Sequence, residues 1–231
     1  MRDPRPLSAR VHDWLRKSIL EVELVPGAPI AESEVAARFS TSRTPVREAL
    51  LKLATEDLVD IQPQRGTFVA RMSLARIEEG LFIRQAIERA VLLRVIERRD
   101  RAPTVELLAG IIREQAAALV EGRVAAALAA DERFHRTLVE ASGVPGVWGV
   151  VMKARDLHHR VRAIAVPELH SGRQALADHV AILRALEAGD PAAGEHAMQE
   201  HLARNLVLAR EIASRHPDYF EPSAARTRSE T

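Results

Sequence analysis

Residues 42–56 read Ser-Arg-Thr-Pro-Val-Arg-Glu-Ala-Leu-Leu-Lys-Leu-Ala-Thr-Glu. Thr44 is a suitable N-cap, and Pro45 suits the first helical position because its missing N–H needs no partner there. The leucines recur at helical spacing, so one face of the helix packs inward. Arg43 and Arg47 bracket the first turn, although cations are disfavoured at the positive end of a helix dipole. Two arginines beside free N–H groups suit a polyanion, and we predict a recognition helix that enters the DNA major groove.

Composition limits the classes of protein that this chain can represent. Its 231 residues suit two domains, and 47% of them are hydrophobic, which is enough for packed cores. No apolar run approaches the roughly 18 to 20 residues that span a bilayer, and the N-terminus lacks the apolar core of a signal peptide. The absence of cysteine excludes disulfides and thiolate metal sites. We therefore expect a cytoplasmic protein without a membrane partner.

The charge is informative only when it is counted locally. The whole chain has a formal net charge of +1, which gives no support to nucleic-acid binding. Residues 38–52 carry a net +3, from Arg38, Arg43, Arg47 and Lys52 against Glu48. A duplex responds to the field of the face presented to it. Only 3% of residues are aromatic, which argues against single-strand binding by base stacking.

The segments around the quoted stretch complete a winged helix-turn-helix pattern. Apolar residues at helical spacing predict helices over 7–22 and 32–39, the second followed by a tight turn. After the recognition helix, β-forming residues in 58–61 and 67–70 flank the turn residues 62–66. We therefore predict a small β-hairpin wing with a basic, glycine-bearing tip.

The remainder of the chain is almost entirely helical in pattern. Helices are predicted over 74–98, 103–121, 123–142, 144–165, 171–188 and 191–215, with breaks at glycines and prolines that include Pro167. The fold class is therefore mainly α. The predicted domains are a winged helix-turn-helix DNA-binding domain (1–72), an all-α helical-bundle ligand-binding domain (73–216) and a polar, disordered tail (217–231).

These segments resemble a known family. The runs Glu32-Ser-Glu-Val-Ala-Ala-Arg-Phe, Ser42-Arg-Thr-Pro-Val-Arg-Glu-Ala-Leu and Arg65-Gly-Thr-Phe-Val are similar to the winged-helix domain of GntR-family transcription regulators. The helical remainder resembles the FCD effector domain of the FadR-like branch. The resemblance implies that operator DNA is contacted by Ser33, Ser42, Arg43, Thr44, Arg47, Arg65 and Gly66. Arginine forks match guanine O6 and N7, whereas hydroxyls and helix N–H groups hold phosphates.

A second group of polar residues lies on helix faces that are otherwise apolar. Asp131 and His135 are one turn apart on the core stripe of the helix over 123–142. His179 and His201 each lie eleven residues from the turn at Asp190, so an antiparallel hairpin places both about 16 Å from the bend. Imidazole and carboxylate suit Zn²⁺, Ni²⁺ or Mn²⁺. The alternative is a buried hydrogen-bonded network without a metal ion.

The resemblance extends to this cluster, because FCD domains carry an Asp and three His at the positions of Asp131, His135, His179 and His201. Many such domains sense small carboxylates or sugar acids. On the stripe of the helix over 74–98, Arg84 either pairs with Glu88 or holds the carboxylate of an effector. Arg160 and Asn205 are further effector-binding candidates.

We therefore expect a homodimeric DNA-binding regulator, and a repressor, controlled by a small organic acid at or near a divalent metal ion. A metal-dependent enzyme built on the Asp/His cluster is one alternative. A DNA-binding regulator with a purely structural metal ion is another. Because no further carboxylate or histidine has the spacing of an obvious general base, we do not expect an enzyme, and no catalytic residue is assigned.

Overall fold

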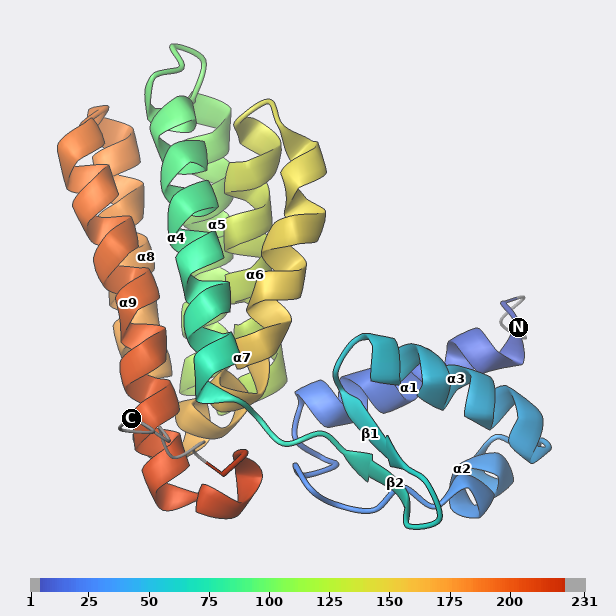
Figure 1. Ribbon diagram of the computed structural model, residues 1–231. Coiled ribbons are helices and arrows are strands. Elements are labelled where there is room, and N and C mark those ends of the chain that lie inside the picture. The colour runs from blue at the N-terminus through green and yellow to red at the C-terminus, as the bar shows by residue number, and fades with distance from the viewer. Residues whose placement is uncertain (1–4, 223–231) are drawn as a thin grey trace, which may run out of the picture. The chain divides into compact units, whose positions relative to one another are not determined.

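The computed structural model describes residues 5–222, which form two compact units (Figure 1). Among the described residues, one unit contains residues 5–74 together with residues 213–222, and the other is Ala75–Ile212. The first contains three helices and a hairpin, and the second is helical throughout. The expected fold class, a winged helix-turn-helix followed by a helical bundle, is confirmed.

Three helices build the core of the first unit: α1 (Leu7–Leu20), α2 (Glu32–Arg38) and α3 (Arg43–Thr55). Their apolar faces meet in one cluster, which includes Val11, Leu15, Ile19, Val35, Leu50 and Leu53. Helix α3 begins earlier than predicted, because its N-cap is Ser42 and not Thr44. Pro45 is tolerated inside the first turn, where backbone N–H groups have no helical partner.

The wing is a hairpin of β1 (Val59–Gln62) and β2 (Gly66–Val69), paired antiparallel from Val59↔Val69 to Gln62↔Gly66. Gly66 has a φ of +114°, a conformation that L side chains rarely adopt, so glycine suits the tip. The free edge of β2 is covered by the chain before α2, where the N–H of Ile30 donates to Thr67 O at 2.8 Å. This pairing joins the wing to the helical core.

The prediction of a disordered tail from residue 217 onward is wrong for residues 217–222. A 3₁₀ turn, η2 (Pro217–Tyr219), leads to Phe220, whose side chain is buried. The backbone of Met72 pairs there, with its N–H donating to Tyr219 O at 2.8 Å. One apolar side chain and a short β-bridge are enough to order a polar segment. Residues 223–231 lie outside the described part of the chain.

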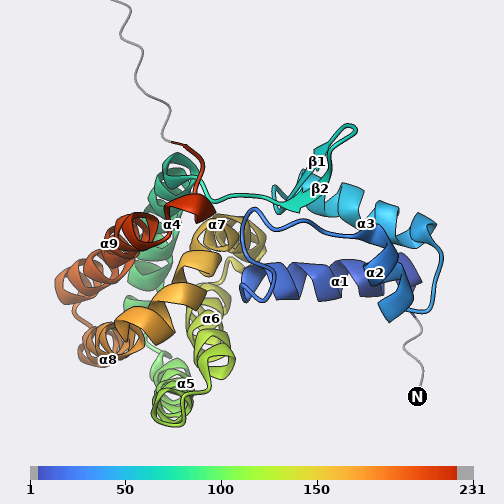
Figure 2. The same cartoon turned by 90° about the horizontal axis from the view of Figure 1, so that it is seen from below.

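The second unit is a bundle of α4 (Leu74–Ile96), α5 (Ala102–Val120), α6 (Val124–Ala141), η1 (Pro145–Val147), α7 (Trp148–Leu169), α8 (Gly172–Ala188) and α9 (Pro191–Arg215). Figure 2 looks along these helices: α4 lies between α7 and α9, and α5 lies between α6 and α8. A Cβ on Gly80 of α4 would come within 2.9 Å of Ala154 O in α7, so glycine permits this close approach.

Helix α7 continues further than the predicted end at residue 165. It passes through Pro167 and ends at Leu169, and the C-cap residue His170 adopts a left-handed conformation and donates its N–H to Ala165 O. A proline in the last turn removes only one helical hydrogen bond, so the helix can continue for two more residues.

The hydrophobic core of the bundle is mostly aliphatic, with Phe134 as its fully buried aromatic residue, and it contains the buried faces of α4, α5, α6, α8 and α9. Of the helices in residues 5–222, none is both long and apolar enough to cross a membrane.

Candidate functional site

The residues expected to read DNA are solvent-exposed in the first unit. Ser42, Arg43 and Thr44 lie at the start of α3, and Ser33 lies in the first turn of α2. Arg65 and Gly66 are exposed at the tip of the wing. The apolar face of α3 is buried in the core, so its charged residues remain available to a partner.

Two of the arginines in this region already have partners within the unit. Arg47 donates through Nε to Glu32 Oε2 at 2.8 Å, and its side chain is 63% exposed. An exposed pair of this kind contributes about 0 to 1 kcal/mol, so DNA can displace Glu32 at little cost. Arg38 stacks over the indole of Trp14, 4.5 Å from the ring centroid, and points toward α1. Among the four cations between residues 38 and 52, Arg38 is therefore engaged in a contact within its own unit.

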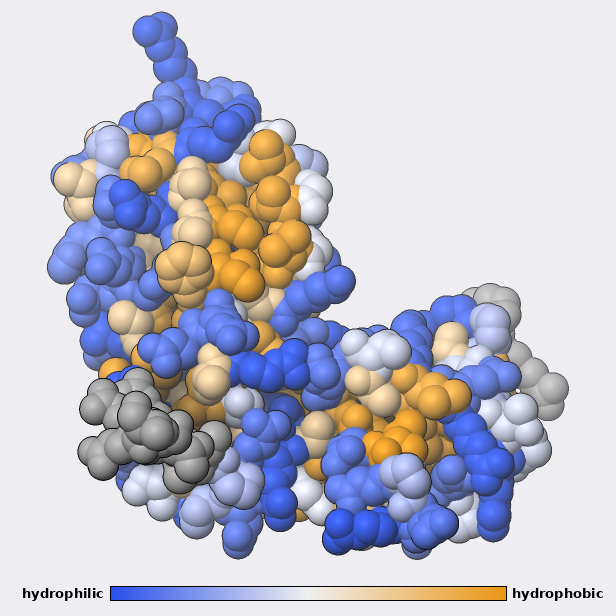
Figure 3. Space-filling view, viewed as in Figure 1, coloured by the Kyte–Doolittle hydropathy of each residue, from blue (hydrophilic) through white to orange (hydrophobic). Residues whose placement is uncertain are grey.

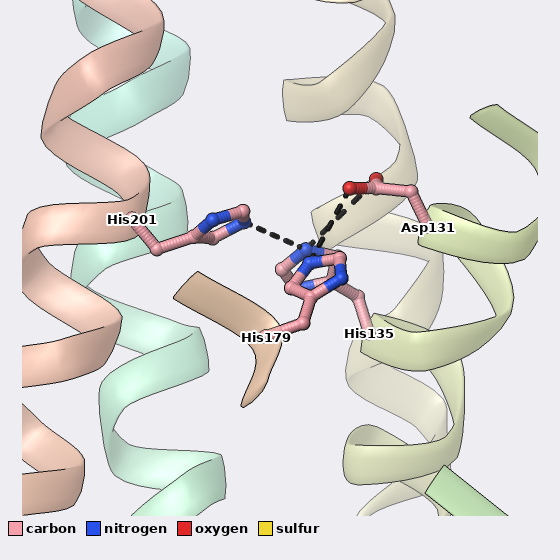
Figure 4. A group of neighbouring side chains, drawn as sticks. All are labelled: Asp131, His135, His179 and His201. Atoms are coloured by element: carbon pink, nitrogen blue, oxygen red, sulfur yellow. Dashed lines mark hydrogen bonds and ion pairs between the residues drawn. The ribbon is translucent and has the colours of Figure 1, made fainter. Parts of the chain in front are cut away.

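The structure brings the four expected metal ligands together inside the helical bundle (Figure 4). Asp131 and His135 come from α6, His179 from α8 and His201 from α9. All four residues are buried, and one potential ligand atom from each lies within 4.8 Å of the others. The ring of Phe134 stacks on that of His179 at 4.0 Å between centroids, which holds the imidazole in place.

The distances between these atoms suit a shared metal ion. Nε2 of His135 lies 3.2 Å from Nε2 of His201, and Nε2 of His179 lies 3.4 Å from Asp131 Oδ1. Ligands bound at about 2.0–2.1 Å to one tetrahedral ion would lie about 3.4 Å apart. Among the described residues, Nε2 of His179 has no hydrogen-bond partner. A buried nitrogen of this kind is suited to metal coordination.

A second set of side chains faces the other ring nitrogens of the histidines. Glu88 Oε2 lies 2.5 Å from Nδ1 of His135, and Gln115 Oε1 accepts from Nδ1 of His179 at 2.8 Å. Asp178 Oδ2 lies 3.5 Å from Nδ1 of His201. A carboxylate or amide oxygen near each Nδ1 favours the tautomer with its proton there, and this tautomer leaves a lone pair on each Nε2.

Burial keeps the imidazoles of His135 and His179 neutral. It lowers the pKa of His135 to about 4, although Glu88 acts in the opposite direction. Burial, with the neighbouring His201, also holds the pKa of His179 well below its usual value. Neutral imidazole is the form that binds a metal ion, so His135 and His179 are in the ligand form at neutral pH.

Asp131 is also held by two arginines of α7. Arg155 Nη2 donates to Oδ2 at 2.8 Å, and Arg162 donates to both carboxylate oxygens, through Nη2 at 2.7 Å and through Nη1. Burial raises the pKa of the Asp131 carboxyl, but Arg162 and Arg155 outweigh it and hold that pKa well below its usual range. The carboxylate is therefore ionised, as a metal ligand must be.

The expected effector residues have different surroundings. Arg84 pairs with Glu88 at 2.5 Å, which is one of the two alternatives that the sequence left open. Nη1 of Arg84 also lies 2.7 Å from His158 Nε2. Arg160 is buried in α7 but lies about 160° around the helix from Arg162. Asn205 is buried beside the cluster on α9 and donates to the carbonyl oxygens of its own helix.

Sequence reasoning missed Arg155 and Arg162, although a signal for them exists. Arg155, His158 and Arg162 follow three-and-four spacing on α7 with buried Val151, so they share one inward face. Arginines on such a stripe require partners, as Asp131 and His135 do. Gln115 and Asp178 carry no comparable signal, because their importance depends on which imidazole each one faces.

A groove of about 340 Å³ opens beside the cluster. It lies between the C-terminal part of α7, the start of α8 and α9. His201 and Arg162 belong both to the groove lining and to the buried cluster, so its inner end reaches the candidate metal site. The groove therefore adjoins the cluster at these two residues.

Comparison with known proteins agrees with this architecture. Residues 7–69 match "Bacterial regulatory proteins, gntR family", and residues 79–204 match the FCD domain. The chain is 32% identical over 216 residues to the HTH-type transcriptional repressor RspR of Escherichia coli (strain K12), covering 94% of each protein. It is 30% identical to a probable D-xylose utilization operon transcriptional repressor of Paenarthrobacter nicotinovorans, covering 87% of each.

Solved structures show the same fold. Escherichia coli McbR/YncC superposes with a TM-score of 0.74 at 19% identity, over 90% of this chain and 99% of that one. A putative GntR transcriptional regulator from Rhodococcus sp. RHA1 gives 0.73 at 22% identity, over 90% and 98%. Because these relatives are regulators, the expectation that the protein is not an enzyme is confirmed. The chain belongs to the GntR family of DNA-binding transcriptional regulators, among those that carry an FCD domain.

Proposed function

We propose that the protein is a homodimeric, cytoplasmic repressor whose operator affinity is set by a small organic acid. The acid binds at or near a divalent metal ion held by Asp131, His135, His179 and His201. The observation that carries this proposal is the convergence of three histidine Nε2 atoms and one ionised carboxylate in a buried cluster. Zn²⁺, Ni²⁺ and Mn²⁺ are the ions whose ligand preferences fit.

The charge of the loaded site favours an anionic effector. Asp131 carries one negative charge, whereas Arg155, Arg162 and a divalent ion together carry four positive charges. The other buried acids nearby, Glu88 and Asp178, each have an arginine partner of their own. Because an excess of buried positive charge is costly, a carboxylate ligand would stabilise the site. We therefore assign the effector carboxylate to Arg162, in place of Arg160.

Arg84 and Asn205 remain effector-binding candidates with supporting roles. Arg84 is linked to the site by its pair with Glu88, whose carboxylate faces His135. Asn205 lines the inner part of the groove beside His201. Neither side chain faces Asp131 in the way that Arg155 and Arg162 do.

The proposed DNA contacts are Ser33, Ser42, Arg43, Thr44, Arg47, Arg65 and Gly66. Their exposure at the start of α2, at the start of α3 and on the wing supports this assignment. Arginines at the start of α3 have the forked donors that match guanine in the major groove. The hydroxyl residues beside them suit phosphate contacts.

A homodimer is supported by an uncovered apolar face of the helical unit. Hydrophobic side chains gather over α4 and α7 in Figure 3. The exposed large hydrophobic residues of these two helices are Phe82 and Ile83 of α4, which are 73% and 38% exposed, and Val150 of α7 at 50%. Contiguous exposed apolar surface marks interaction sites, and operator symmetry generally mirrors the symmetry of a protein dimer.

The test measures DNA affinity with the ion and the acid varied separately. Selection from a random duplex library supplies an operator, and fluorescence anisotropy then follows its binding to the full chain. We expect small carboxylates to change the dissociation constant about tenfold or more, a coupling of about 1.4 kcal/mol, with the metal-loaded protein only. An ion that raises the melting temperature but leaves every DNA affinity unchanged would show a purely structural metal, and would overturn the proposed control.

A further inference from the structure

The groove beside the cluster has aliphatic walls. Its sides are formed by Val166 and Leu169 of α7, Ala175 of α8, and Val207 and Leu208 of α9. Val207 is 68% exposed at the outer side, whereas Val166 is 8% exposed. The groove therefore runs from solvent to the interior along hydrocarbon surface.

Four of the polar side chains in the lining, Gln174, Asp178, Arg204 and Asn205, already have hydrogen-bond partners in the protein. Asp178 accepts from Gln174 Nε2 at 3.0 Å and from Arg204 Nε at 2.9 Å. Asn205 donates through Nδ2 to the carbonyl oxygens of His201 and Leu202. A ligand rich in hydroxyl groups would have to break these bonds or leave its own hydroxyls without partners, and both are unfavourable.

The inner end of the groove carries one cationic side chain and one candidate metal ligand. Arg162 reaches the groove lining and binds Asp131 with both Nη atoms. His201 forms part of the same end and belongs to the candidate ligand set. One end of the groove therefore suits an anion, and the remainder suits hydrocarbon.

From this polarity we infer that the effector is a monocarboxylate with an apolar tail or ring: its carboxylate lies at the Arg162 end, and its hydrocarbon part lies between Val166, Ala175 and Leu208. This inference rests on the proposed function, because it names the class of acid that the sensor binds. It excludes polyhydroxy acids such as sugar acids as the preferred class. The volume of about 340 Å³ equals about eleven waters at roughly 30 Å³ each, which is enough for a six-carbon acid.

Hexanoate and gluconate form a matched pair of probes, since both have six carbons and one carboxylate and they differ by five hydroxyl groups. Acetate tests the carboxylate end alone. Each buried methylene strengthens binding about fourfold, so we expect hexanoate to bind the Zn²⁺-loaded full chain about tenfold or more tightly than acetate. Gluconate is expected to bind no more tightly than acetate. Isothermal titration calorimetry and the shift in melting temperature measure these affinities.

Filling the groove tests its location. Ala175→Leu adds a side chain to the half-buried wall of α8 and should reduce hexanoate affinity about tenfold while acetate affinity changes less than threefold. Ala177→Leu is the matched control, because Ala177 is an exposed alanine two positions further along the same helix. It should leave both affinities unchanged.

The possible results distinguish a failure of the apolar-tail inference from a failure of the proposed sensor function. Gluconate binding that exceeds hexanoate binding would overturn the apolar-tail inference and leave a carboxylate sensor in place. Hexanoate binding that is unaffected by Ala175→Leu would overturn the placement in this groove. If the metal ion binds but acetate, hexanoate and gluconate all fail to bind, the proposed function fails together with the inference.

Discussion

Nε2 of His135 lies 3.2 Å from Nε2 of His201, although 66 residues separate the two in the sequence. Carboxylate oxygens face the Nδ1 atoms of both rings, which favours lone pairs on the two facing Nε2 atoms. Two lone pairs at this separation repel unless a proton or a metal ion lies between them. Because burial lowers the pKa of His135 to about 4, the cationic form of this imidazole is disfavoured at neutral pH. A metal ion would accept both lone pairs at once, which is the arrangement that the proposed site requires.

Removing one ligand should weaken metal binding without unfolding the DNA-binding unit. His179→Ala removes a buried imidazole whose Nε2 lies 3.4 Å from Asp131 Oδ1. We expect Zn²⁺ affinity to fall by about a hundredfold or more, since an effect of 10–100-fold is typical even of residues behind the ligands. Competition with a chromogenic chelator measures it. His196→Ala, at an exposed histidine of α9, is the control, and equal affinities in the two variants would contradict the assignment.

Asp178 should tune the metal affinity through His201. Asp178→Asn keeps a side chain of the same shape but removes the charge that faces Nδ1 of His201, and we expect a loss of about 10–100-fold in Zn²⁺ affinity. The control is Glu200→Gln, because Glu200 also lies near Arg204 but belongs to no imidazole contact that the structure records. If both variants lower metal affinity equally, the effect belongs to Arg204 and not to His201.

Arg47 should contribute directly to operator recognition. Arg47→Ala breaks only an exposed pair with Glu32 in the free protein, so the fold should be unaffected. Loss of one base contact typically costs about 1–3 kcal/mol, which predicts operator binding about 5- to 150-fold weaker in a gel-shift titration. Lys17→Ala, at an exposed cation of α1, serves as control. Unchanged operator affinity in Arg47→Ala would remove this residue from the reading surface.

Two glycines in helix interiors should respond oppositely to alanine. A Cβ at Gly80 would meet Leu157 Cδ1 at 2.8 Å and Ala154 O at 2.9 Å, so Gly80→Ala should destabilise the packing of α4 on α7 by about 1–3 kcal/mol. At Gly110 of α5 the nearest atom is Arg113 Nη2 at 3.9 Å, so Gly110→Ala should stabilise the protein by up to about 1 kcal/mol. Urea unfolding followed by circular dichroism measures both, and a neutral Gly80→Ala would contradict the close approach.

The metal-free protein should lose stability in mild acid. His135 has a pKa of about 4 when folded, below its ordinary value of 6.5, so the unfolded chain binds more protons between these pH values. The contribution of His135 to the free energy of unfolding is complete above pH 6.5 and is lost as the pH falls toward 4. The loss is on the order of 3 kcal/mol. His179 and His158, whose pKa values burial also lowers, add to the same trend.

Melting temperatures of chelator-treated protein at pH 7.5, 6 and 5 check this trend. The decrease should be smaller in His135→Asn, because asparagine does not titrate, and unchanged in His196→Asn. A melting temperature that stays constant from pH 7.5 to 5 would contradict the buried, neutral state of these histidines.

Much of the fold was predictable because helical periodicity is a local property of the chain. The wing followed from β-forming residues on either side of Gln62 to Gly66, and the bundle followed from apolar stripes between glycine and proline breaks. The end of α7 was predicted too early, since whether a helix continues past Pro167 depends on how its last turn closes. The order of residues 217–222 was also missed, because it depends on the burial of Phe220 and on pairing with Met72, which lies far away in sequence.

The sequence by itself determined two things about the site. The three-and-four spacing placed Asp131 and His135 on one helix face, and equal distances from the turn at Asp190 placed His179 and His201 at the same height. Only the tertiary structure decided what surrounds those ligands. Arg155 and Arg162 lie at Asp131, 24 and 31 residues from it in sequence, and the aliphatic groove opens beside His201. Local spacing fixes the direction of a side chain from its own helix, but its partner depends on how several helices pack together.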